Sequence, residues 1–285
     1  MKLVINCVTR GRPERLVETI AHTMRNIVDP ETRLLVSIDD DDIESQTAIK
    51  SFSSDHRIIP VVRPREDSLG AKFNRVLQYP GDVYMPMADY THIVTPGFDR
   101  KILEAASLFP DNIGVVYNHM ANASFPSIWC VTHGLAQKMG WMCPPYFPYW
   151  FVDHWVDDVA KLIGRVSFVD FQIGYREKPV TQEFRELAFW CTLFDVLRLE
   201  RRAQARAIID SPDFMEPECR KEILRRHYPL IEYRSQWVND SLRARAPSLI
   251  SNADGGERYN RLREKAVQMM NKAMPALVAE MEKAA

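Results

Sequence analysis

The sequence predicts an α/β fold with a mainly parallel central sheet, flanked by helices and followed by a helical C-terminal extension. Up to about residue 175, short apolar runs typical of buried parallel strands alternate with helix-like segments. Beyond about residue 180 the apolar residues recur only at helical spacing. We therefore expect a first domain over residues 1–180 and a helical extension over residues 181–285.

The first part of the chain is expected to hold four strands joined by helices. Pro13 opens the first helix, because proline is tolerated in the first turn. Gly70–Gln78 is expected to form the helix that precedes the fourth strand, with apolar residues at core spacing. The expected strands are Leu3–Val8, Arg33–Ile38, Arg57–Val62 and Val83–Ala88.

Shorter elements complete the predicted domain, and helices make up the extension. Further strands are expected at Ile113–Tyr117, Ile128–Val131 and Val166–Tyr175, with helices from Asp99 to about Leu108 and over Asp153–Ile163. The extension is expected to hold helices at Phe184–Ile209, Glu218–Arg226 and Glu257–Glu282.

A basic cluster lies in the extension at Arg198, Arg201, Arg202 and Arg206. We expect it to form a solvated helix face, with contact to a phosphate-bearing or membrane acceptor as the alternative. Closure over a site, dimerisation and acceptor binding all stay open as roles for the C-terminal helices.

Composition bounds the class of protein. The 285 residues carry a net charge of -1, so no basic excess indicates a nucleic-acid partner. No run of about 18 apolar residues is present, and the first strand does not resemble a signal peptide. The five cysteines lie far apart, which favours a reducing, cytoplasmic compartment over a disulfide framework or zinc site. Peripheral attachment to a membrane is the alternative location.

Polar clusters follow the ends of four predicted strands, at residues 9–13, 39–42, 67–74 and 89–92. A parallel sheet brings such ends to one rim, where ligands bind, so the clusters predict a single site. Asp89 stands where a ligand or cation is expected. A turn cap is an equally good interpretation of Asp89, because Asp before Thr and Pro-Gly is ordinary turn chemistry.

Four motifs together carry a resemblance to a known family. The motifs are VTRGRPERL, SIDDDD, SLGAKFNRVL and YMPMADYTHIVTPGF. In their order and spacing, residues 1 to about 175 resemble an inverting family 2 glycosyltransferase of the GT-A fold, a Rossmann-like architecture. The resemblance implies a nucleotide-sugar donor, with a UDP-sugar expected, and transfer with inversion to a hydroxyl of a glycan or other small acceptor.

The resemblance also implies roles for the residues after the first three strands. Thr9 and Arg10 would belong to the nucleotide pocket, and Asp39 or Asp40 would accept a hydrogen bond from the base. Gly70 would allow close approach of the backbone, and Lys72 would approach the base or the diphosphate. The alternative for the carboxylates of residues 39–42 is a solvated helix start, where the helix dipole favours negative charge. For Asp41 and Asp42 this is the role that we expect.

The family's metal motif is Asp-x-Asp, and this sequence departs from it. Asp89 stands at the first position, Thr91 at the second, and His92 follows. A hydroxyl is a poorer ligand for Mg²⁺ than a carboxylate. Two expectations stay open. Asp89 and His92 hold a cation, in which case Mn²⁺ is expected over Mg²⁺ because histidine is the better ligand for Mn²⁺. Alternatively, the metal is bound weakly or not at all.

By the same resemblance, Asp153 is the expected general base, and Asp157, one helical turn on, is the second candidate. An N-cap role for Asp153 is compatible with that function. His154 is expected to be a packed surface residue. Four aromatic residues would line the acceptor side, although burial in a core is their commoner fate: Tyr146, Tyr149, Trp150 and Trp155.

Two other functions stay open at this level. Nucleotidyl transfer on the same architecture would need a Gly-rich basic loop, of which Arg10-Gly11-Arg12 is a fragment. A non-catalytic carbohydrate-binding or assembly module is suggested by Thr91 at a position where a carboxylate is expected.

Overall fold

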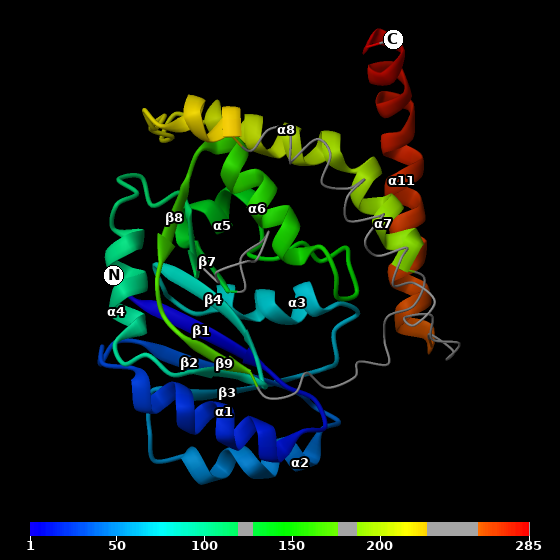
Figure 1. Cartoon of the computed structure of the whole chain (residues 1–285). Coiled ribbons are helices and arrows are strands. Elements are labelled where there is room, and N and C mark those ends of the chain that lie inside the picture. The colour runs from blue at the N-terminus through cyan, green and yellow to red at the C-terminus, as the bar shows by residue number, and fades with distance from the viewer. Residues whose placement is uncertain (119–127, 176–186, 227–255, 285) are drawn as a thin grey trace. The chain divides into compact units, whose positions relative to one another are not determined.

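The computed structural model describes residues 1–118, 128–175, 187–226 and 256–284, which form two compact units (Figure 1). The first unit comprises residues 1–66, 71–118, 128–143 and 166–175. The second comprises residues 67–70, 144–165 and the described residues from 187 onward. Residues 67–70 and 144–165 thus group with the helices, whereas the sequence analysis assigned them to the first domain.

The first unit is built on a seven-stranded sheet with the order β3-β2-β1-β4-β7-β6-β8. The strands β1 to β4 are parallel to one another, and β7 runs antiparallel between β4 and β6. The predicted, mainly parallel sheet is confirmed. The strands are β1 Leu3–Val8, β2 Arg33–Asp39, β3 Ile58–Arg63, β4 Val83–Ala88, β6 Val115–Asn118, β7 Trp129–Thr132 and β8 Val166–Val169.

The strand order reverses direction at β1. After β1 the chain adds β2 and β3 on one side, and then returns to add β4 on the other. Val8 pairs with Ser37 of β2 and with Ala88 of β4. Thr9 and Asp89 therefore leave the sheet together at a topological switch point, where open α/β sheets bind ligands.

The core on one face of the sheet follows from alternation along the strands. Leu3, Ile5 and Cys7 of β1 pack with Leu16 and Ile20 of α1 (Pro13–Asn26), because successive strand residues point to opposite faces. Burial raises the pKa of the Cys7 thiol, consistent with its predicted role as a core residue. In Figure 1, α1 and α2 (Ile43–Ala48) lie together beside the parallel strands.

Several predicted elements are divided by the tertiary structure. Residues 69–78 form a short α-helix, α3 (Leu69–Asn74), followed by a 3-10 turn, η2 (Arg75–Gln78). The predicted strand Val166–Tyr175 splits because β9 (Ile173–Tyr175) leaves the main sheet and pairs antiparallel with β5 (Thr91–Ile93). The remaining elements of this unit are η1 Ile49–Phe52, α4 Phe98–Ala106 and α5 His133–Met139.

The second unit is helical. The predicted helix Phe184–Ile209 is broken at Leu197, and its first residues, 184–186, lie outside the described residues. The predicted helix Glu218–Arg226 has helical backbone over 220–226. No described helix combines the length and the hydrophobicity needed to cross a membrane. The long helices are α6 Val152–Ile163, α7 Leu187–Val196, α8 Arg198–Ile209 and α11 Gly256–Ala284.

A buried arginine organises α6, α7 and α8. Arg201 is 2 % exposed, its Nε lies 2.9 Å from Oδ2 of Asp158, and its Nη1 donates to the Phe194 carbonyl at 2.6 Å. Its guanidinium also lies 3.7 Å from the centre of the Phe194 ring. The predicted solvated role is therefore wrong for Arg201, because this side chain neutralises a buried carboxylate.

Replacing Arg201 should strongly destabilise the second unit. Arg201→Ala leaves Asp158 buried without its cation, and we expect the free energy of unfolding to fall by about 3–5 kcal/mol. Arg206→Ala is the matched control on the same helix, because Arg206 is exposed and pairs at the surface with Asp210. Its effect should stay within about 0.5 kcal/mol. Equal losses for the two variants in denaturant unfolding would contradict a special role for Arg201.

Candidate functional site

A buried carboxylate lies at the switch point of the sheet. Asp89 is 0 % exposed and accepts a hydrogen bond from Oγ1 of Thr9 at 2.7 Å, and Nε of Arg12 lies 3.0 Å from the same carboxylate oxygen, Oδ2. The other oxygen, Oδ1, has no hydrogen-bond partner among the described residues. Burial raises the pKa of Asp89, and Arg12 and Thr9 oppose this shift.

Arg12 reaches Asp89 because of the turn between β1 and α1. Gly11 has a φ of 61°, a conformation that glycine adopts without strain, and its N–H donates to Oδ2 of Asp42 at 2.7 Å. Arg12 is the N-cap residue of α1, and its side chain is 29 % exposed. Arg12 belongs to the predicted polar cluster at residues 9–13, but it was given no role of its own. Its position inside the VTRGRPERL motif, directly after a strand, was the available signal.

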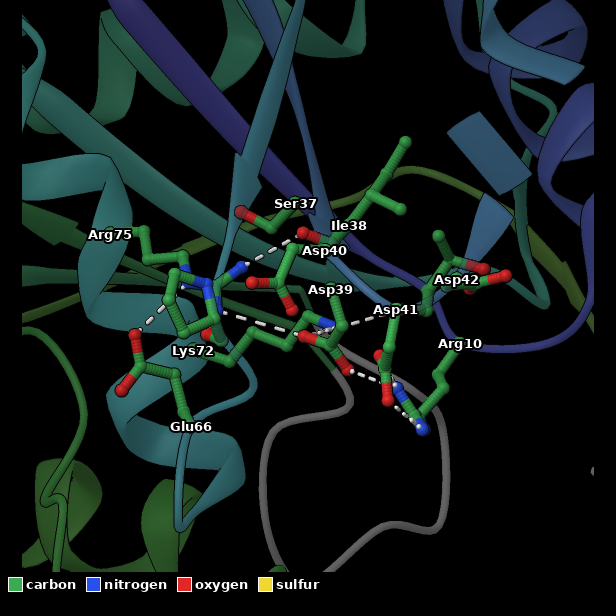
Figure 2. A network of polar contacts seen from close by, with 12 residues as sticks. Arg10, Ser37, Ile38, Asp39, Asp40, Asp41, Asp42, Glu66, Lys72 and Arg75 are labelled. Carbon is green, nitrogen blue, oxygen red and sulfur yellow. Dashed lines mark hydrogen bonds and ion pairs between the residues drawn. The ribbon is translucent and has the colours of Figure 1, made fainter. Parts of the chain in front are cut away.

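A second buried carboxylate, Asp39, ends β2 and is surrounded by cations (Figure 2). Nζ of Lys72 lies 2.8 Å from Oδ1, and Nη1 of Arg10 lies 3.1 Å from Oδ2. Nη2 of Arg75 lies 3.6 Å from Oδ1. Both oxygens of Asp39 are therefore engaged within the protein. Arg75 was not predicted, although it follows Lys72 by three residues, a spacing that places two side chains on the same helix face.

Lys72 joins the ends of two strands. Its Nζ also donates to the carbonyl of Thr9 at 2.7 Å, so one ammonium links Thr9 to Asp39. Burial lowers the pKa of Lys72, and the charge of Asp39 opposes this shift. In this conformation the ammonium is committed to the strand ends, whereas the sequence analysis expected Lys72 to approach the base or diphosphate.

The other carboxylates after β2 divide into different roles. Asp41 binds Arg10 through two hydrogen bonds, of 2.5 and 2.8 Å, which lower the pKa of Asp41 to about 2. Asp42 accepts from the Ser45 N–H at 3.3 Å and caps α2, so it lies at a helix start as expected, but it is buried and not solvated. Asp40 is exposed, and this leaves its carboxylate accessible to a ligand.

The described residues fit a divalent cation poorly. The ring of His92 stacks on His22 of α1, with ring centres 4.5 Å apart, and Thr91 is buried in β5. No group of three or more His, Cys, Asp or Glu side chains that could hold a metal occurs among the described residues. The positive charge of Arg12 lies against the same carboxylate, Asp89, and opposes the binding of a divalent cation there.

Asp153, the expected base, pairs with the next residue in the second unit. Its Oδ1 accepts from the N–H of His154 at 2.8 Å and lies 2.7 Å from Nδ1 of the same residue. The His154 ring is buried and packs edge-on against Phe151 and Phe194. Phe151 has a φ of 71° and starts α6, which sets Asp153 in the first turn. The expected surface role of His154 is therefore corrected to a buried one.

Burial raises the pKa of Asp153, but the charge and the hydrogen bonds of His154 outweigh it, so the pKa lies below the ordinary value of 3.8. The second candidate, Asp157, is 0 % exposed and lies 2.8 Å from Nζ of Lys161. This ion pair gives Asp157 a structural role in α6.

The remaining predicted residues also lie in the second unit. Gly70 is buried in the first turn of α3. Trp155, expected on the acceptor side, is a core residue whose Nε1 donates to Oε1 of Gln204 at 2.8 Å. Three of the expected aromatic residues are half-buried: Tyr146, Tyr149 and Trp150.

The sequence matches no protein-family model and no curated protein sequence. The structure is similar to the mannosyltransferase PcManGT from Pyrobaculum calidifontis, in complex with GDP-mannose and Mn²⁺, at 12% identity and a TM-score of 0.54, over 98% of this chain and 86% of that chain. It is also similar to residues 1–349 of S. aureus TarS in complex with UDP, at 13% identity and a TM-score of 0.55, over 94% and 92%. These similarities confirm the predicted GT-A fold.

Removing the His154 ring should raise the pKa of Asp153. In the wild type the depressed pKa stabilises the fold above about pH 4, and this contribution is lost as the pH falls through the folded-state value. His154→Leu keeps an apolar contact with Phe151 and the backbone N–H that donates to Oδ1, but it removes the charge and the ring N–H, so burial of Asp153 is less opposed and its pKa rises. Carboxyl ¹³C NMR titration measures the shift. The exposed His56→Leu is the control, and an Asp153 pKa that stays unchanged in His154→Leu would contradict the pair.

Proposed function

We propose that the chain transfers a sugar from a nucleoside diphosphate to a hydroxyl of a glycan or other small acceptor, with inversion at the anomeric carbon. The observation that carries the proposal is the meeting of strand ends at the switch point of a GT-A sheet. There Thr9 contacts Asp89 through its hydroxyl and Lys72 through its carbonyl. A site of this kind, in this fold, suits a nucleotide ligand.

The structure favours Asp40 over Asp39 as the contact to the base. Asp39 is buried and its oxygens are bound by cations, whereas Asp40 is exposed directly after it. A carboxylate there accepts a hydrogen bond from the ring N–H of uracil or guanine. Cytosine has an acceptor at the equivalent ring position, so the same carboxylate disfavours it. We therefore propose a uracil or guanine nucleotide as donor, with UDP expected.

Asp153 is the proposed general base. It takes the proton of the acceptor hydroxyl while the hydroxyl oxygen attacks the anomeric carbon from the face opposite the nucleotide. The bond from the anomeric carbon to the diphosphate oxygen breaks, and its electron pair leaves with the nucleoside diphosphate. His154, bound to Oδ1, orients the Asp153 carboxylate for this proton transfer.

Location in the cytoplasm and dimerisation through the C-terminal helices stay predictions.

Asp153→Asn should lower the rate of sugar transfer by about 10²–10⁴-fold, because an amide does not take the proton. Binding of UDP should be unchanged. Asp157→Asn is the matched comparison on α6. It should lower the melting temperature, because it weakens the ion pair with Lys161, but it should cause no selective loss of turnover. Turnover by Asp153→Asn at the wild-type rate would remove Asp153 from the mechanism. Release of pyrophosphate from a nucleoside triphosphate would favour nucleotidyl transfer instead.

Asp40→Asn should reduce the preference for UDP over CDP. The variant loses a charge-assisted hydrogen bond to the uracil N–H, so we expect UDP to bind about 10-fold more weakly. CDP should bind no more weakly than before, because it lacks that N–H. Isothermal titration with both nucleotides measures the change. Glu44→Gln, an exposed change nearby on α2, is the control, and an undiminished UDP preference in Asp40→Asn would exclude Asp40 as the base contact.

A further inference from the structure

Arg12 and Asp89 form an ion pair at the point in the sheet where a nucleotide is proposed to bind. Nε of Arg12 lies 3.0 Å from Oδ2 of Asp89 without completing a hydrogen bond, so the ion pair does not use the two Nη groups of the guanidinium. With 29 % of its side chain exposed, Arg12 combines an anchored charge with access to a ligand. A planar guanidinium is well suited to phosphate, because it presents several N–H donors in a fixed fork.

Three other cations near the strand ends, all of which contact Asp39, are committed elsewhere. Arg10 uses both Nη groups on Asp41 and Asp39. Lys72 is bound to Asp39 and to the carbonyl of Thr9, and Arg75 pairs with Asp39 and Glu66. Arg12 is therefore the cation of this cluster that is best placed to meet an anion from outside.

The charge balance also favours Arg12 over a metal. Asp89 supplies one negative charge and Arg12 one positive charge, so the pair is neutral, whereas a divalent cation would bring two positive charges to one carboxylate. Thr91 adds no charge, and the His92 ring stacks on His22.

We infer that Arg12, held by Asp89, binds the diphosphate of the donor in place of a divalent cation, so that donor binding needs no metal. The inference rests on the proposed function and specifies how the donor is held. The guanidinium would also stabilise the negative charge that develops on the leaving diphosphate, since it is fixed in position before the reaction begins.

The first test needs no variant. Binding of UDP and of GDP to the full chain is measured by isothermal titration, once with EDTA and once with Mn²⁺ or Mg²⁺. We expect at least one of the nucleotides to bind, with dissociation constants that agree within about twofold across these conditions. Binding about tenfold tighter with a cation than with EDTA would overturn the inference and leave the proposed transferase standing. Absence of binding by both nucleotides in every condition would overturn the proposed function, and the inference with it.

The second test assigns the effect to Arg12. In EDTA, Arg12→Gln should weaken nucleotide binding about 10- to 100-fold, because charge-assisted hydrogen bonds to phosphate are lost. Arg25→Gln, an exposed change in the last turn of the same helix, should leave binding unchanged. Arg12→Gln leaves Asp89 buried without its cation. The double variant that combines Arg12→Gln with Asp89→Asn removes both charges and is therefore measured as well. Its nucleotide affinity should fall by the same factor. Wild-type affinity in this folded double variant would overturn the inference.

Discussion

Two carboxylates at the strand ends, Asp39 and Asp89, are removed from water, and this constraint organises the surrounding polar residues. A buried carboxylate is costly unless a cation and hydrogen bonds compensate it. Asp39 is compensated by Lys72, Arg10 and Arg75, and Asp89 by Arg12 and Thr9. Thr9 belongs to both groups, since its hydroxyl contacts Asp89 and its carbonyl accepts from Lys72. The two ion clusters are thus joined through one residue at the end of β1.

The same rule operates in the helical unit with different partners. Asp158 is buried against Arg201, and Asp157 against Lys161. Asp153 differs, because it is half-buried and its partner is a histidine. A carboxylate that is held by a neighbour and still reachable suits proton transfer, whereas fully buried ion pairs hold helices together. This contrast is why we retain Asp153 as the proposed base and assign structural roles to Asp157 and Asp158.

Much of the fold was predictable because buried parallel strands are short apolar runs with polar ends. The predicted bounds of β1 and β4 agree with the structure, those of β2 differ by one residue at its C-terminal end, and those of β3 differ by one residue at each end. The elements that were missed, β5 and α5, have too few residues to show a period. The break at Leu197 was also missed, because apolar spacing continues across it and the change of direction depends on how Phe194 and Arg201 pack.

For the candidate site, the sequence alone determined which segments converge, since the ends of parallel strands meet at one rim. Thr9, Arg10, Asp39 and Asp89 were found in this way. Only the tertiary structure decided which carboxylate receives which cation, because the partners come from segments up to 80 residues apart whose separation follows from strand register. Arg12 could be assigned to Asp89, and Lys72 to Asp39, only once β1 was seen to lie between β2 and β4. Ion pairing depends on distances of a few ångströms, and residue order along a chain does not contain those distances.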